Sequence, residues 1–197
     1  MKFNNLLFAL SAFGMTCLLA EISPLKAESY AWPAFRGPGK QGHAIAANVP
    51  VKWSNTENLA WKVKTTVSGW ASPVVATDTI ILAGAKDLDG QLTLHVASHA
   101  LKDGSLLWET EVVNPDPAVV KRRHQKNSYA SCTPILSDGV IYAHFGHLGT
   151  CALDLESGKV IWKQVIEYQP VHGNGGSPVL VDDLLIFSVD GSKNPAV

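Results

Sequence analysis

The feature that most constrains this 197-residue chain is a short segment that occurs three times. It reads ASPVVATDTIILAG at 71–84, CTPILSDGVIYAHFG at 132–146 and GSPVLVDDLLIFSVDG at 176–191. Each copy has a small hydroxyl residue and a proline, then a short apolar run, a polar turn and a second apolar run. This order is typical of a β-hairpin, because proline is accommodated at the first residue of a strand. The repeat therefore predicts an all-β fold made of hairpins.

A second block, ending in tryptophan, follows the first two copies. It reads SHALKDGSLLW at 98–108 and ALDLESGKVIW at 152–162. Both versions begin with a small residue and contain a turn whose glycine can adopt a positive φ at little cost. Two hairpins in succession, about 40 residues in all, make a four-stranded antiparallel unit of the size of one β-propeller blade.

The block at 152–162 resembles the AxDxxTGxxxW motif of the PQQ-like β-propeller repeat family, with serine in place of the motif threonine. That family includes quinoprotein alcohol dehydrogenases and the non-enzymatic outer-membrane assembly scaffold BamB. The block at 98–108 matches more loosely, because Ala100 stands where the motif has aspartate. The resemblance implies that the motif residues dock one blade on the next. The residues expected to do so are Trp61, Trp108, Ala152, Asp154, Gly158 and Trp162.

The resemblance runs from about Trp32 to the C-terminus and implies a ring of seven or eight blades in the full protein. Eight such blades need more than ~300 residues, so we expect this chain to be an N-terminal fragment with about two and a half blades. The alternative is a small open sheet that dimerises to hide its edges. The expected parts are a lead-in and an outer strand within 28–68, with the strand at 53–66, followed by blades at 69–113, 131–167 and, incomplete, 176–197.

The first 27 residues have the composition of a secretory signal peptide. Lys2 gives a positive start, and the run at 6–20 is apolar and uncharged. Cleavage is expected after Ala27, with Ala20 as the alternative. A retained membrane anchor is the other interpretation, but the run is shorter than the ~20 apolar residues that a spanning helix needs. We therefore expect an exported bacterial protein, periplasmic or extracellular, with no transmembrane span after cleavage.

The charges of the chain are nearly balanced, with 16 Lys and Arg against 17 Asp and Glu. No broad basic field is present, so a nucleic-acid partner is not expected. The expected partner is a protein, a peptide or a glycan. Cys132 and Cys151 remain after signal cleavage. They could form one disulfide in an oxidising compartment or stay two small buried residues, and the second alternative is favoured.

Two loops depart from the repeat, at 114–130 and 171–177, and each precedes the innermost strand of a blade. The first is rich in cationic side chains, which could hold a carboxylate, phosphate or sulfate. Because such loops gather on one face of a propeller, we expect the two histidines and two asparagines among the candidates to converge. The alternative is solvated loops whose polar residues serve turn geometry. The ligand-loop candidates are Arg122, Arg123, His124, Lys126, Asn127, His172 and Asn174.

Four other histidines are expected to have no functional role. His95 and His99 lie on one face of a predicted strand, and we expect that face to be exposed. His144 and His147 flank a predicted bend and are interpreted as turn residues, because no third metal ligand accompanies them. No catalytic residue and no metal site are predicted.

The sequence thus favours an exported, non-catalytic binding or scaffolding module. The alternative, implied by the resemblance alone, is a PQQ-dependent dehydrogenase whose catalytic residues lie in blades outside this chain. Such enzymes hold PQQ against a tryptophan, under a disulfide between adjacent cysteines, beside Ca²⁺. This sequence has no adjacent cysteine pair. PQQ with Ca²⁺ is therefore an expectation from the resemblance, and the residues themselves predict no cofactor.

Overall fold

The computed structural model describes residues 31–44, 49–120, 123–189, 191 and 195–197. The segment expected to be a signal peptide, 1–27, lies outside these residues. Within the described part, the secondary structure is β apart from two short 3₁₀ turns, η1 (Pro38–Lys40) and η2 (Gly146–Leu148). The expectation of an all-β fold is confirmed. No helix in the described part of the chain is long and apolar enough to cross a membrane.

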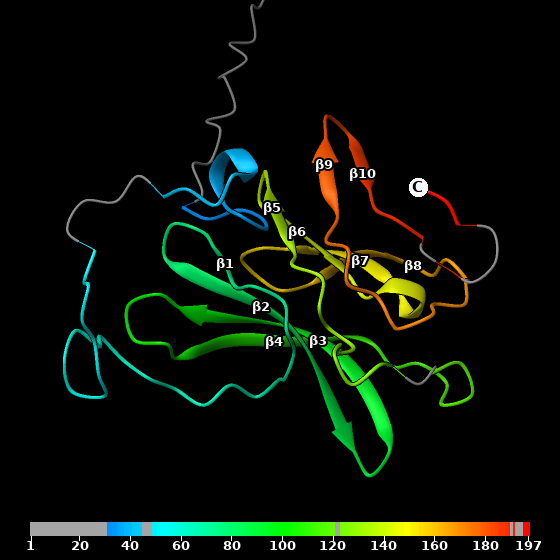
Figure 1. Ribbon diagram of the computed structural model, residues 1–197, viewed down its shortest axis with the longest axis horizontal. Coiled ribbons are helices and arrows are strands. Elements are labelled where there is room, and N and C mark those ends of the chain that lie inside the picture. The colour runs from blue at the N-terminus through cyan, green and yellow to red at the C-terminus, as the bar shows by residue number, and fades with distance from the viewer. Residues whose placement is uncertain (1–30, 45–48, 121–122, 190, 192–194) are drawn as a thin grey trace, which may run out of the picture.

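The strands form two four-stranded antiparallel sheets and one further hairpin (Figure 1). The first sheet contains β1 (Val74–Val75), β2 (Thr79–Leu88), β3 (Gln91–Ala100) and β4 (Leu106–Val113). The second contains β5 (Ile135–Ser137), β6 (Val140–His144), β7 (Thr150–Asp154) and β8 (Val160–Gln164). The hairpin consists of β9 (Val179–Val181) and β10 (Leu184–Ile186). In both sheets each strand pairs with the next one along the chain, which is the meander of a propeller blade.

The polar turns inside the hairpins lie where the sequence predicts them, and their backbone is left-handed. Asp138 and Gly139, between β5 and β6, have φ values of 48° and 75°, and Asp182, between β9 and β10, has 52°. A turn that the sequence analysis missed, at Asp89 and Gly90, joins β2 to β3. These two strands are 10 residues long, and their hairpin projects well beyond the rest of the sheet (Figure 1).

Two tryptophans rest on the turn glycines of the following unit. A Cβ atom added to Gly158 would lie 2.5 Å from Cε3 of Trp108, and one added to Gly104 would lie 2.7 Å from Cε3 of Trp61. Both glycines also have positive φ values, 68° and 73°. Only glycine therefore combines the backbone conformation and the space that the indole requires. Trp61 Nε1 also donates a hydrogen bond to the carbonyl oxygen of Leu101, at 2.9 Å.

The turn aspartates hold the same two tight turns from different positions. Asp154 Oδ1 accepts hydrogen bonds from the backbone N–H and the hydroxyl of Ser157, at 2.7 and 2.5 Å. In the first sheet Asp103 Oδ1 accepts the corresponding pair from Ser105, at 3.0 and 2.6 Å. These bonds lower the pKa of both carboxyl groups. Asp103 thus compensates for Ala100, which replaces the motif aspartate.

Trp162, the third tryptophan of the repeat, is less covered than the other two. In the β7–β8 pair it lies opposite Ala152, which is fully buried. Its own side chain is 37% exposed and lies 6.3 Å from the ring of Tyr142. Among the described residues no turn glycine packs on its indole.

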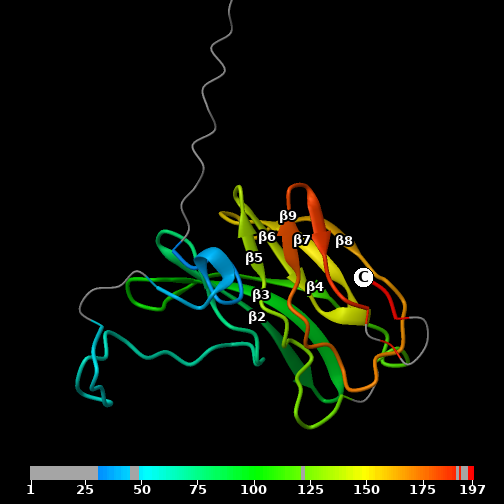
Figure 2. The same cartoon turned by 45° about the horizontal axis from the view of Figure 1, so that its top comes forward.

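The hydroxyl residues of the repeated Ser/Thr-Pro pairs link neighbouring units. The backbone N–H of Ser72 donates to Thr133 Oγ1 at 3.1 Å, and the N–H of Thr133 donates to Ser177 Oγ at 3.0 Å. Because each residue precedes the first strand of its unit, these bonds hold the innermost strands side by side. Figure 2 shows the β9–β10 hairpin lying along the second sheet.

The outer strand expected at 53–66 is not formed, which corrects the sequence-based expectation. In this region the described chain contains no strand, and the nearest pairing is an isolated bridge between Ser68 and Ala85. A strand needs a neighbouring backbone to pair with. Here the contacts come mainly from side chains, such as Trp61 on Gly104 and the hydrogen bond from Thr66 Oγ1 to Glu109 at 2.5 Å.

The apolar core lies between the two sheets. It is continuous from one sheet to the other, and its fully buried members include Ile81, Leu94 and Val96 of the first sheet and Ile141 and Leu153 of the second. Burying side chains of this size contributes about 1.5–3 kcal/mol each, so the pair of sheets forms one stable body on which the loops are mounted.

Candidate functional site

The loop between β4 and β5 carries most of the candidate residues, and a hydroxyl–amide network fixes its second half. Asn127 Oδ1 accepts hydrogen bonds from the N–H of Ser128, at 2.8 Å, and from the hydroxyl of Ser131, at 2.5 Å. The two serine hydroxyls lie 2.9 Å apart, and Ser128 Oγ accepts the backbone N–H of Trp70 at 3.2 Å. The network therefore anchors this part of the loop to the segment that leads into the first sheet.

The loop at 171–177 meets this anchored segment at the carbonyl oxygen of His172. That oxygen accepts the backbone N–H of His124, at 3.2 Å, and Asn127 Nδ2, at 3.1 Å. The two imidazole rings lie edge to face with their centroids 5.2 Å apart. The structure thus brings together His124, Asn127 and His172, although 45 residues separate the asparagine from the second histidine.

The tautomer of His124 follows from its neighbours. His124 Nδ1 lies 3.1 Å from the backbone N–H of Lys126, which can only donate. In the neutral ring the proton is therefore on Nε2, the nitrogen available to a ligand. His124 presents a hydrogen-bond donor when neutral and keeps that donor when it is charged.

Two further cationic candidates lie in the same loop. Arg123 Nη1 donates to the carbonyl oxygen of Asn127 at 2.8 Å, and its guanidinium lies 5.2 Å from the centroid of the Tyr129 ring. Stacking on tyrosine restrains the side chain without neutralising its charge. Lys126 is exposed. Arg122 lies outside the described residues.

A surface hollow of about 330 Å³ opens between the two loops. Its lining is Arg123, His124, Gln125, Val171 and His172, which includes no carboxylate. A hollow lined by a guanidinium and two imidazoles suits an anionic group better than a cation or an apolar ligand. We call Arg123, His124, Lys126, Asn127 and His172 the cationic loop surface.

Asn174 lines a smaller pocket together with Arg123 but does not line the hollow, so the convergence expected of it is found only in part. Its Oδ1 accepts the hydroxyl hydrogen of Tyr168 at 2.8 Å, and its Nδ2 donates to Cys132 Sγ at 2.9 Å. Its Cβ also lies 2.5 Å from where a Cβ of Gly146 would be, and Gly146 has a φ of 65°. The amide therefore connects the loop to the second sheet and is not available to a ligand.

A half-buried charged cluster on the first sheet was missed by the sequence analysis. Glu109 lies 2.5 Å from Lys86 Nζ and 2.8 Å from His95 Nδ1, and it also accepts the Thr66 hydroxyl. Burial lowers the pKa of His95, while the nearby Glu109 opposes that change. Burial alone would raise the pKa of Glu109, but hydrogen bonds from Lys86 and Thr66 lower it. The cluster attaches the segment at 61–68 to the sheet.

The histidines of the sheets differ from the sequence-based expectation. His95 and His99 are only 6% and 4% exposed. Val67 packs on Gly84, the β2 partner of His95, so the segment at 61–68 lies over the face that we expected to be free. His99 Nδ1 lies 3.0 Å from the carbonyl oxygen of Gly104. His144 is a buried strand residue, and His147 lies in η2. A strand pattern alone gave their common face but not the segment that covers it.

A site for PQQ with Ca²⁺ would need particular cysteines, metal ligands and an open tryptophan face. Cys132 and Cys151 are free and buried, and burial raises the pKa of both thiols to about 12. Among the residues that the structure describes, no group of three or more His, Cys, Asp or Glu is arranged to hold a metal ion. The faces of Trp61 and Trp108 are taken by turn glycines. The described residues do not fit this cofactor.

Comparison with known proteins gives a family and a curated relative. The model of the family described as outer membrane protein assembly factor BamB matches residues 40–194. The outer membrane protein assembly factor BamB of Yersinia pestis is 27% identical over 117 residues, which are 59% of this chain and 26% of the relative. The chain therefore spans about a quarter of the length of this curated relative.

Two solved structures have a weaker likeness to the chain. A europium-containing methanol dehydrogenase is 18% identical with a TM-score of 0.44, covering 64% of this chain and 22% of the other. BamB from Moraxella catarrhalis is 13% identical with a TM-score of 0.27, covering 57% of this chain and 45% of the other.

Proposed function

Because the chain belongs to the family of the outer membrane protein assembly factor BamB, we propose that it is part of an exported propeller that binds a protein partner and catalyses no reaction itself. The proposed place of action is the bacterial periplasm. The name of the Yersinia pestis relative gives a role in outer membrane protein assembly. We extend that role to this chain as the binding of an outer membrane protein during its assembly.

The observation that carries this proposal is the locking of two loops from successive repeats into one surface. The carbonyl oxygen of His172 accepts hydrogen bonds from both His124 and Asn127. Loops that are fixed on a rigid scaffold present their side chains with little further loss of conformational entropy on binding. The cationic loop surface is thus organised before a partner arrives.

The charge of this surface indicates what kind of partner segment it suits. Arg123 and Lys126 are cationic side chains, and His124 presents an N–H donor at Nε2. An extended partner segment with aspartate or glutamate side chains supplies the matching acceptors. Since the surface is exposed, its electrostatic attraction is expected to weaken as salt is added.

The test uses the full chain and a purified, urea-unfolded outer membrane porin labelled with a fluorophore. On dilution from urea, fluorescence anisotropy is expected to report binding that weakens with added salt. Arg123→Gln combined with Lys126→Gln is expected to lower the affinity by about tenfold, since two charge-assisted contacts are removed. Lys102→Gln is the matched control, because Lys102 is 87% exposed on the turn between β3 and β4.

The proposal is contradicted if the porin does not bind, if the double variant binds as well as the wild type, or if Lys102→Gln lowers the affinity to the same extent as the double variant. The quinoprotein alternative is tested separately by titrating the full chain with PQQ and Ca²⁺. Saturable binding in the micromolar range would favour that alternative.

A further inference from the structure

The first strand of each repeated unit has one edge that faces away from its own hairpin. Val75, Leu136 and Leu180 occupy equivalent positions, each three residues after the hydroxyl residue of the Ser/Thr-Pro pair. In an antiparallel pair, alternate residues direct both the N–H and the C=O away from the neighbouring strand. These three residues therefore offer backbone hydrogen-bonding groups to a further extended segment.

The lead-in of the chain occupies two of these three edges as an extended peptide. Trp32 donates its N–H to the Val75 oxygen at 2.9 Å and accepts the Val75 N–H at 2.8 Å. The next residue, Pro33, accepts the N–H of Leu136 at 2.8 Å. The molecule itself thus shows that these edges bind extended backbone.

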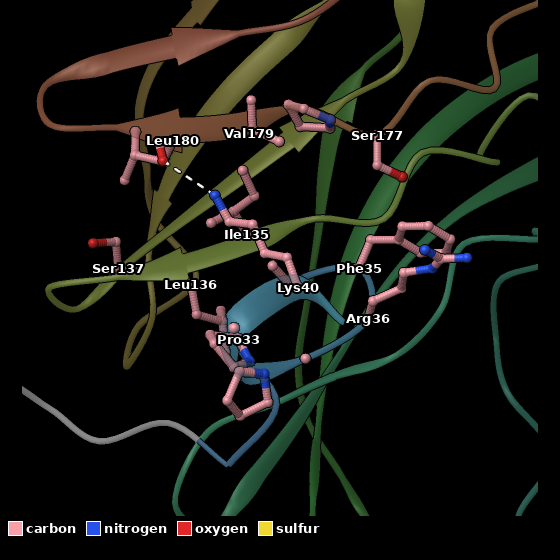
Figure 3. A pocket seen from close by; sticks show the side chains of 15 residues that line it. Pro33, Phe35, Arg36, Lys40, Ile135, Leu136, Ser137, Ser177, Val179 and Leu180 are labelled. Atoms are coloured by element: carbon pink, nitrogen blue, oxygen red, sulfur yellow. Dashed lines mark hydrogen bonds between the residues drawn. The ribbon is translucent and has the colours of Figure 1, made fainter. Parts of the chain in front are cut away.

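The third edge is left open because the lead-in turns away before it reaches β9. Gly37 and Gly39, with φ values of 66° and 70°, redirect the chain into η1. Val181 and Leu184 flank the two-residue turn of the β9–β10 hairpin and pair with each other. The backbone N–H and C=O of Leu180 therefore point away from β10. No described residue accepts the Leu180 N–H on this edge. Its carbonyl oxygen is contacted by Lys40 Nζ, at 3.5 Å (Figure 3).

A pocket of about 420 Å³ lies beside this edge, between η1, β5 and β9 (Figure 3). Its walls are mostly apolar, and Phe35 and Val179 remain 50% and 38% exposed there. Its charged residues are Arg36 and Lys40, both cationic, and no carboxylate lines it. The pocket therefore combines a free strand edge, an apolar surface and uncompensated positive charge.

We propose that this pocket binds the C-terminal end of an apolar polypeptide. The peptide backbone pairs with the free edge of Leu180, its last side chain lies against Phe35 and Val179, and its terminal carboxylate accepts hydrogen bonds from Lys40. A terminus fits better than the middle of a chain because the Lys40 side chain crosses from η1 to β9 and blocks an added strand from continuing (Figure 3). The carboxylate replaces the neutral Leu180 oxygen as the acceptor of the ammonium group.

This site is separate from the cationic loop surface, and the two are tested with different residues. The probe is the fluorescein-labelled peptide Ala-Val-Ala-Val-Phe, titrated against the full chain in its free-acid form and as its C-terminal amide. The acid is expected to bind about tenfold more tightly than the amide, since one charge-assisted contact is lost. A peptide that is N-methylated at the residues before the C-terminal one lacks the backbone N–H donors for the strand edge. It is expected to bind about tenfold less well.

Variants of Lys40 identify the carboxylate contact. Lys40→Met is expected to remove the difference between acid and amide, whereas Lys40→Arg keeps it. Lys102→Met, on the exposed turn between β3 and β4, leaves it unchanged. Near-ultraviolet circular dichroism of the tryptophans checks that each variant is folded.

The proposal is overturned if acid and amide bind equally, if neither binds, or if Lys40→Met preserves the preference of wild type. An amidated peptide with aspartate as its last residue is the remaining arm. If it binds as tightly as the free acid, the site recognises an acidic side chain and the assignment to a chain terminus is wrong. None of these results depends on whether the porin binds to the cationic loop surface.

Discussion

The two contacts between successive units differ although the same repeat builds both. Between the first sheet and the second, Trp108 rests on Gly158, Thr110 Oγ1 donates to the Gly158 oxygen at 2.7 Å, and an apolar core is continuous across the contact. Between the second sheet and the β9–β10 hairpin, the contacts include the hydrogen bond from Thr133 to Ser177 and the packing of His144 against Phe187. There Val160 and Ile161 of β8 remain 40% and 55% exposed.

This difference shows that the tryptophan of one unit is covered only where the next unit supplies its turn glycine. Trp108 and Trp162 occupy equivalent positions at the ends of their blocks, opposite Ser98 and Ala152. The first is covered because the turn of β7 and β8 supplies Gly158, and the second stays 37% exposed. The hairpin of β9 and β10 contributes no corresponding turn. The stability that each tryptophan provides is therefore expected to be unequal.

The largest expected effect comes from truncating the covered tryptophan. Trp108→Ala should lower the free energy of unfolding by about 4 kcal/mol, since it removes a large packed side chain and leaves a cavity. Trp162→Ala should cost about 1 kcal/mol, because that residue is 37% exposed and no described turn glycine packs on its indole. Urea unfolding followed by circular dichroism measures both. Equal losses would break the comparison and indicate that the two contacts are equivalent in solution.

Acid should weaken the contact between the second sheet and the β9–β10 hairpin, because it protonates His144. This ring is 1% exposed, lies 4.1 Å from the Phe187 ring, and has its pKa lowered by burial from 6.5 to about 4. In the unfolded chain it takes up a proton near pH 6.5, so its contribution is complete above that pH. The contribution is lost progressively as the pH falls toward 4, by up to about 3 kcal/mol.

His144→Gln isolates this effect because glutamine does not titrate and can still hydrogen-bond to Thr150, the present partner of the ring. Urea unfolding between pH 7 and pH 4 should show a smaller loss of stability for the variant than for the wild type. Parallel curves for the two proteins would mean that His144 is protonated as easily in the folded chain as in the unfolded one.

Sequence could predict the features that depend on neighbours along the chain or on the repeat itself. The hairpin turns, the tryptophan-ending blocks and the approach of His124 to His172 all follow from aligning one unit with the next. Burial of His95 could not be predicted this way, because it depends on where the segment at 61–68, which precedes the first hairpin, lies on the sheet. The contact of Lys40 with Leu180 joins residues that are 140 positions apart, and no local sequence pattern predicts it. For Asn174, the alignment predicted the position in the loop but not the partners of its amide group, Tyr168 and Cys132.

The smallest expected effect concerns the hydroxyl links that both contacts share. Thr133 is 1% exposed, so Thr133→Val should leave the Ser72 N–H without its acceptor at a cost of about 1–2 kcal/mol, while the similar shape limits any packing loss. Ser177→Ala removes the acceptor of the Thr133 N–H, but Ser177 is partly exposed and water can replace it, so about 0.5 kcal/mol is expected. Hydrogen exchange at the Ser72 and Thr133 amides measures each link separately. If Ser177→Ala lowers stability more than Thr133→Val does, the contact with the β9–β10 hairpin excludes water better than the contact between the two sheets. That result is the reverse of what the structure indicates.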